Sequence, residues 1–125
     1  MNFKTITPPR KFEVGSNEQR IQLSHVMDLF LTPDEQLTLK TEKGGEVDIC
    51  RKEWGYYATP SLNGRLKKFG YKSCLVDSRG RRYIHIVEKE NMEVYFDYLS
   101  QQNMKVIAWL DDEHFADLDE KLEVK

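Results

Sequence analysis

The chain has 125 residues, of which 39% are hydrophobic and 32% charged, with a formal net charge of −2. This size allows one hydrophobic core and is too small for two, so we expect a single domain over residues 1–125. No apolar run approaches the roughly 18–20 residues that cross a bilayer, and the first residues lack the apolar core of a secretory signal, so we expect a cytoplasmic protein without membrane partners.

The first quarter of the chain predicts extended structure. Residues 1–11 contain a Pro-Pro pair and no clear periodicity, which predicts an extended arm. A short strand is expected at 12–14 and a longer one at 20–31, where apolar and polar residues alternate with a period near two. His25 lies on the apolar side of this alternation, so we expect a hydrogen-bonded core histidine rather than a catalytic one.

The remainder of the chain predicts alternating hairpins and helices. Thr59 suits the N-cap of a helix and Pro60 its first position. From residue 47 the expected order is β-α-β-β-α-β, which is compatible with a ferredoxin-like arrangement. We therefore predict the α+β class, an antiparallel β-rich sheet with two helices, ending in an acidic tail at 112–125. The expected elements are a hairpin of 36–42 and 46–51, a helix at 60–69, a hairpin of 71–76 and 82–87, a helix at 90–102 and a central strand at 104–110.

No recognised catalytic or metal-binding pattern is present. Cys50 and Cys74 lie in apolar runs without CxxC spacing, which predicts buried free thiols, and the histidines lack the paired spacing of a zinc site. Glycine-rich phosphate loops and the GxSxG elbow are also absent. We therefore assign no catalytic residue, metal or cofactor, although an enzyme built from dispersed residues, such as His85 with Glu88 or Tyr57, stays open.

The segment from residue 54 to 70 is the candidate site. It combines aromatic side chains, an expected helix N-terminus whose free N–H groups attract anions, and nearby cations. Such a set would suit a nucleotide or a nucleotide sugar. The alternative is that Trp54 and one tyrosine are core residues and that Thr59 only caps the helix. The candidate ligand-binding residues are Trp54, Tyr56, Tyr57, Thr59, Ser61, Asn63, Arg65 and Lys68.

Charge is unevenly distributed along the chain. Seven cations against one acid lie between residues 65 and 82, and seven acids against two cations lie between 111 and 125. This asymmetry suggests an anionic partner for the basic part, or a match between the two parts within or between chains. An RNA-binding interpretation would use Tyr71 and Tyr83 for base stacking, but the pI of about 5.9 and the lack of an RNP1 motif disfavour it. The cations are Arg65, Lys67, Lys68, Lys72, Arg79, Arg81 and Arg82.

The residues from about 20 to 112 resemble a family of small bacterial proteins associated with surface-polysaccharide gene clusters. The motifs that carry this resemblance are Trp54-Gly55, Ala58-Thr59-Pro60-Ser61, Asn63-Gly64-Arg65-Leu66 and Trp109-Leu110-Asp111-Asp112. The resemblance implies a biological context and no catalytic residues.

These observations favour a non-catalytic binding or accessory module for an anionic small molecule, such as a nucleotide or nucleotide sugar, or for a partner protein. Three alternatives remain open. They are a small enzyme acting on a nucleotide sugar or carbohydrate, an RNA-binding module, and a homo-oligomer in which the acidic tail meets the basic hairpin of a neighbour.

Overall fold

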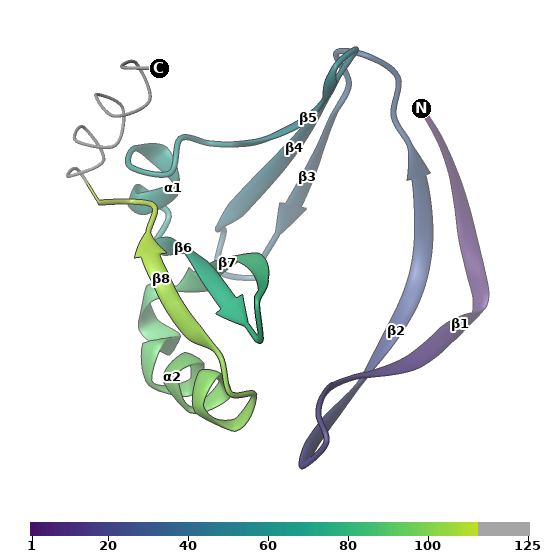
Figure 1. Ribbon diagram of the computed structural model, residues 1–125. Helices are drawn as coiled ribbons and strands as arrows, with labels where there is room; N and C mark the ends of the chain where they lie inside the picture. Colours follow the sequence, from purple (N-terminus) through teal and green to yellow (C-terminus); the bar gives the residue numbers. More distant parts are fainter. Residues whose placement is uncertain (113–125) are drawn as a thin grey trace, which may run out of the picture.

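The computed structural model describes residues 1–112 and has the predicted α+β class, with antiparallel sheets and two α-helices (Figure 1). No helix in this part of the chain is long and apolar enough to span a membrane. The strands are β1 (Asn2–Ser16), β2 (Gln19–Phe30), β3 (Gln36–Lys40), β4 (Glu46–Lys52), β5 (Gly55–Thr59), β6 (Tyr71–Ser78), β7 (Arg81–Glu88) and β8 (Lys105–Trp109). The helices are α1 (Arg65–Lys68) and α2 (Met92–Gln101), the latter preceded by a 3-10 turn (Lys89–Asn91).

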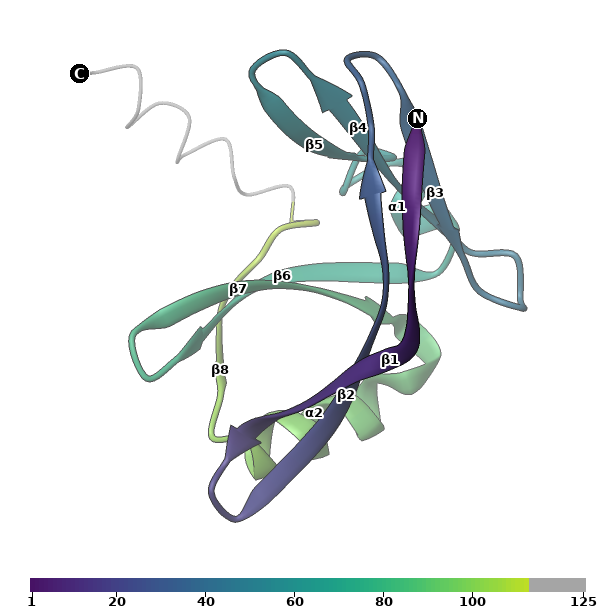
Figure 2. The ribbon, with the colours of Figure 1, turned by 90° about the vertical axis from the view of Figure 1, so that its right-hand side faces the viewer.

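Strands β1 and β2 form a long two-stranded ribbon. The expected arm and the short strand after it are one continuous strand, β1, which pairs antiparallel with β2 from Asn2↔Phe30 to Ser16↔Gln19. The register shifts between Thr5 and Arg10. Figures 1 and 2 show the ribbon running along one side of the molecule, with its turn near the end of α2. The alternation of apolar residues in β2 therefore predicted a strand correctly.

The second sheet has the order β3-β4-β5. The predicted hairpin of β3 and β4 is confirmed, with Leu37 opposite Ile49. Strand β5 was not predicted, and it pairs with the other edge of β4, where Cys50 lies opposite Tyr57. Because both edges of β4 are occupied, β4 does not join β6 and β8 in one sheet. The ferredoxin-like arrangement is therefore not what the chain adopts.

The third sheet has the order β7-β6-β8, so β6 is its central strand. The predicted hairpin of β6 and β7 is confirmed, whereas β8, expected to be central, lies at an edge. Helix α2 lies along one face of this sheet (Figure 1). It buries Tyr95 and Leu99 against Cys74, Val76 and Val87, which form the main hydrophobic core of the described chain.

Helix α1 is shorter than predicted. The expected helix at 60–69 begins only at Arg65, because the backbone carbonyl of Ser61 accepts the N–H groups of both Gly64 and Leu66 and forms a turn there. Thr59 ends β5 instead of capping a helix. The side chain of Leu66 is 1% exposed and packs α1 against the rest of the chain beside β6.

Two further expectations concern the thiols and the tail. Cys50 and Cys74 are both buried and free, as predicted. The acidic tail was predicted at 112–125, and all but its first residue lies outside the described residues.

Candidate functional site

The aromatic members of the predicted site are exposed. Trp54 lies in the turn between β4 and β5 and is 72% exposed. Its ring stacks on that of Tyr57, with centroids 6.3 Å apart and an interplanar angle of 21°. Tyr56 points to the other face of the sheet, where the guanidinium of Arg51 lies 5.2 Å from its ring centroid. The alternative in which Trp54 is a core residue is thus not what the structure shows.

The polar members lie elsewhere. Strand β5, five residues long, separates Trp54 from Thr59 by roughly 17 Å. Arg65 lies beyond it on α1, where its guanidinium is 5.4 Å from the centroid of Phe69. The other predicted members, Ser61, Asn63 and Lys68, belong to the turn before α1 and to α1 itself. The structure therefore does not gather the aromatic rings and the cations of this segment around one hollow.

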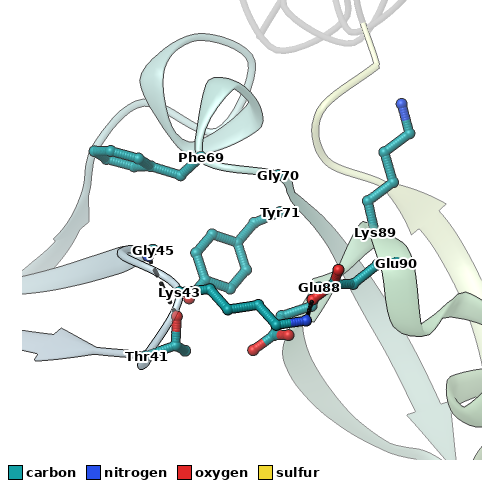
Figure 3. Close-up of a pocket in the computed structure, with 9 residues that line it drawn as sticks. All are labelled: Thr41, Lys43, Gly45, Phe69, Gly70, Tyr71, Glu88, Lys89 and Glu90. Atoms are coloured by element: carbon teal, nitrogen blue, oxygen red, sulfur yellow. Dashed lines mark hydrogen bonds and ion pairs between the residues drawn. The ribbon is translucent and has the colours of Figure 1, made fainter.

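One hollow of about 410 Å³ lies where the β3–β4 turn meets the third sheet (Figure 3). The aromatic ring of Tyr71 stands against Gly45, and a Cβ atom on Gly45 would come within 2.6 Å of the Tyr71 hydroxyl. Lys43 reaches across to Glu90, with Nζ and Oε1 2.5 Å apart. The lining of this hollow carries as many acids as cations, which gives no preference for an anion or a cation. We therefore interpret the hollow as a gap left where the β3–β4 turn packs against the third sheet.

A larger cleft of about 690 Å³ lies between the ribbon and the third sheet. We call it the ribbon cleft. Three parts of the chain line it. The ribbon supplies Val14, Arg20 and Leu23, and α2 with the residues after it supplies Tyr98, Gln102 and Met104. Strands β6 and β7 and the turn between them supply Ser78, Arg79, Arg81, Tyr83 and His85. None of the described residues that line it is an aspartate or a glutamate.

Three arginines give the ribbon cleft its charge. Arg20 approaches Glu13 at 3.4 Å, a long and exposed contact. Within residues 1–112, Arg79 and Arg81 have no acidic partner. The β6–β7 turn holds Arg79 at φ 54°, and the Asp77 carboxylate accepts the backbone N–H of Gly80 in the same turn. The arginine charge at this cleft is thus not cancelled by a described lining residue.

Aromatic rings line the cleft beside these cations. Tyr83 is 45% exposed, and the half-buried ring of Tyr98 lies 6.3 Å from His85. His85 Nδ1 and the Tyr95 hydroxyl are 2.8 Å apart, and that hydroxyl is 3.2 Å from the Cys74 sulfur. Burial lowers the pKa of His85, so its imidazole is neutral near pH 7. Burial also raises the pKa values of Tyr95 and Cys74, so both stay protonated there.

Gln102 fixes the ribbon over the cleft. Its side chain is 4% exposed; Oε1 accepts the backbone N–H of Ser16 at 2.9 Å, and Nε2 donates to the carbonyl of Gln19 at 2.8 Å. The Ser16 hydroxyl also donates to the carbonyl of Gln101. The turn of the ribbon is thereby attached to the end of α2.

Part of this cleft was named from the sequence, under other interpretations. Arg79, Arg81 and Tyr83 belonged to the RNA-binding alternative, and His85 to the dispersed enzyme. Arg20 and Tyr98 were missed, because they come from the ribbon and from α2 and share no local pattern with β7. No group of three or more metal-ligating side chains is found within the described residues. Comparison with models of known families, with curated proteins and with solved structures finds no match to the chain.

Proposed function

We propose that the protein is a binding module for an anionic small molecule with an aromatic ring, a nucleotide or nucleotide sugar, held in the ribbon cleft. The observation that carries this proposal is the grouping of Arg20, Arg79 and Arg81 around the rings of Tyr83 and Tyr98, with no carboxylate among the described lining residues.

The size and chemistry of the cleft suit such a ligand. Its volume of about 690 Å³ lies within the roughly 300–1,000 Å³ of small-molecule sites. Guanidinium groups bind phosphate through paired, charge-assisted hydrogen bonds. An exposed tyrosine ring such as that of Tyr83 offers a surface on which a base stacks. A phosphate at the arginines and a base on Tyr83 would use both features together.

Binding fits this cleft better than catalysis does. His85 is the one imidazole among the described lining residues, and its observed partner is the Tyr95 hydroxyl. No carboxylate orients or charges the imidazole, and no serine or cysteine is hydrogen-bonded to it in the described chain. Before a ligand binds, the imidazole is therefore a neutral hydrogen-bonding group.

Isothermal titration of the full chain with AMP, UMP, UDP-glucose and the parent nucleosides tests the proposal. We expect the phosphorylated compounds to bind and the nucleosides to bind at least tenfold more weakly. Arg81→Gln should weaken nucleotide binding by roughly 10- to 100-fold, as for the loss of a hydrogen bond between charged groups.

Arg82→Gln is the matched control. Arg82 is the next residue of β7, is also exposed and points to the other face of the sheet. The Arg82→Gln substitution removes one positive charge outside the cleft, as Arg81→Gln does inside it, so we expect little change in nucleotide affinity. Equal losses for both variants would indicate general electrostatic attraction, and the absence of any binding at millimolar nucleotide would overturn the proposal. A loss with Trp54→Ala alone would instead place the ligand at the β4–β5 turn.

A further inference from the structure

One face of the ribbon carries most of its large apolar side chains, with Thr5, Arg10 and His25 between them, and the part of this face outside the ribbon cleft is not covered. Cross-strand partners share a face, so the register of β1 and β2 places seven large apolar side chains together. None of them is buried, and Phe3 is 61%, Leu23 44% and Met27 40% exposed. An isolated two-stranded ribbon is at best marginally stable in water. The seven are Phe3, Phe12, Val14, Ile21, Leu23, Met27 and Leu29.

The β3-β4-β5 sheet shows the same feature more sharply. Its polar face is the buried one, since Asp48 is 5% and Cys50 7% exposed, and the Thr38 hydroxyl donates to the Asp48 carboxylate at 2.6 Å. Its apolar face has no buried residue, and Leu39 and Tyr56 are 56% and 58% exposed. Antiparallel sheets normally turn the apolar face to the core. This open face carries Leu37, Leu39, Val47, Ile49, Tyr56 and Ala58, together with Arg51, whose guanidinium lies over the ring of Tyr56.

The ribbon is attached to the rest of its own chain at its two ends. At its turn, Ser16 and Gln19 are hydrogen-bonded to the end of α2. At its other end, where β1 begins and β2 ends, the Met1 amine contacts the Glu35 carboxylate at 3.1 Å. Between these ends, no hydrogen bond or ion pair joins the ribbon to another element within residues 1–112. A second chain can therefore contact the middle of the ribbon without displacing such interactions.

We propose that a second copy of this chain covers both apolar faces, in a two-fold dimer in which the ribbon of each chain lies on the open β3-β4-β5 face of the other. Each chain carries one face of each kind, so a two-fold axis satisfies all four faces at once. A fully buried aliphatic or aromatic side chain of this kind removes about 60–120 Å² from water. Val14 and Leu23 line the ribbon cleft, so eleven side chains remain, and covering their exposed parts would remove roughly 400 Å² per chain. This is about half of the roughly 800 Å² per partner of a standard interface, and a polar rim around the apolar contact would supply the rest.

The dimer adjoins the proposed ligand site, because Val14 and Leu23 lie on the apolar face and also line the ribbon cleft, so the proposed contact uses the rest of that face. Met27 and Leu39 do not line the ribbon cleft, so variants at these positions leave its lining unchanged. The dimer also differs from the charge-based oligomer considered from the sequence, because an apolar interface persists in high salt whereas contacts between exposed charges are screened.

Sedimentation of the full chain tests the proposal directly. At about 100 μM we expect twice the 14.8 kDa chain mass, unchanged between low salt and 1 M NaCl. Met27→Lys should give monomers at the same concentration. Val26→Lys is the control, because Val26 is the preceding residue of β2, is 56% exposed and points to the other face of the ribbon. A monomeric natural chain, or dimers that Met27→Lys leaves intact, would overturn the proposal.

Cross-linking keeps the test independent of folding defects. Met27→Cys and Leu39→Cys chains are prepared separately, mixed and oxidised, and the native thiols do not interfere because both are buried. We expect a mixed disulfide dimer in the mixture and far less cross-linking in Leu39→Cys alone. Cross-linking of Met27→Cys to itself, with none in the mixture, would contradict the reciprocal arrangement and support ribbon-to-ribbon contact.

Discussion

The side chain of Gln102 donates from Nε2 to the backbone carbonyl of Gln19 at 2.8 Å, which joins residues 83 positions apart in the sequence. Together with the bond from the Ser16 N–H to Oε1, this contact holds the turn of the ribbon at the end of α2. The position of one wall of the ribbon cleft therefore depends on one buried amide.

We predict that Gln102→Ala lowers the free energy of unfolding by about 1–3 kcal/mol, because two partly buried hydrogen bonds to the ribbon turn are lost. It should also increase amide hydrogen exchange in residues 14–23 while β6 stays protected. Gln101→Ala is the control, since Gln101 is exposed and contributes its backbone carbonyl. Unchanged exchange at the ribbon turn would show that other contacts hold it there.

The sequence predicted those elements whose signals are local. Strand β2 alternates apolar and polar residues, and the β6–β7 hairpin has a turn from Asp77 to Gly80, so both could be placed. Strand β5 could not be placed from the sequence. Its last residue, Thr59, precedes Pro60 in a pattern typical of a helix start, and the pairing of β5 with the neighbouring β4 shows that Thr59 is extended. Hairpin pairing there outweighs the helix-start signal.

The site was harder to predict for the same reason. Arg79, Arg81 and Tyr83 are close in sequence, so they could be grouped as a basic, aromatic surface. Arg20 and Tyr98 come from segments about 60 residues before and 15 after them, respectively. Their meeting depends on how the ribbon returns to the end of α2, and no periodicity or spacing encodes that path.

Gly45 is predicted to resist substitution for reasons of space. A Cβ atom there would lie 2.6–2.9 Å from the hydroxyl oxygen and ring carbons of Tyr71, which is 6% exposed and cannot move freely (Figure 3). Gly45→Ala should therefore cost about 1–3 kcal/mol of stability, as for other overpacked positions. Urea unfolding measures this cost.

The matched test places Gly45→Ala in a Tyr71→Leu background, which lacks the clashing outer ring atoms. There the added methyl group should cost much less, so the two substitutions should be non-additive. Additive costs would show that the backbone conformation, rather than the ring of Tyr71, excludes a side chain.

Glu35 is predicted to contribute to acid sensitivity. Hydrogen bonds from the Thr32 backbone N–H and hydroxyl, each 2.8 Å, and from the Met1 amine lower the pKa of Glu35 from 4.5 to about 2. The folded state thus binds the proton more weakly than the unfolded chain. The stabilisation is complete above pH 4.5 and is lost as the pH falls towards 2.

Glu35→Gln should therefore be less stable than the natural chain at pH 7, with a difference that shrinks between pH 4.5 and 2. Urea unfolding across this range provides the measurement. Glu53→Gln, at an exposed carboxylate without a hydrogen-bond partner in the described chain, is the control for the loss of one negative charge. A constant difference between Glu35→Gln and the natural chain would contradict the assigned pKa.

His85 is predicted to couple nucleotide binding to pH. Its pKa is lowered by burial, so the unfolded chain takes up a proton before the folded chain as the pH falls below 6.5. Stability should then decrease on acidification from about pH 6.5 and level off below the folded pKa. An anion beside the imidazole favours the charged form, so nucleotide binding should take up a proton and strengthen as the pH falls towards the lowered pKa of His85.

Titration calorimetry in buffers of different ionisation enthalpy measures this proton uptake. The Tyr95 hydroxyl beside the imidazole and the Cys74 thiol beside that hydroxyl stay protonated over the range, because burial raises their pKa values. His85→Gln should abolish the pH dependence of affinity. His25→Gln should keep it, because His25 lies on the ribbon with Asp28 and does not line the cleft. Equal proton uptake by the His85→Gln variant would place the titrating group outside the ribbon cleft and would separate the ligand from the imidazole.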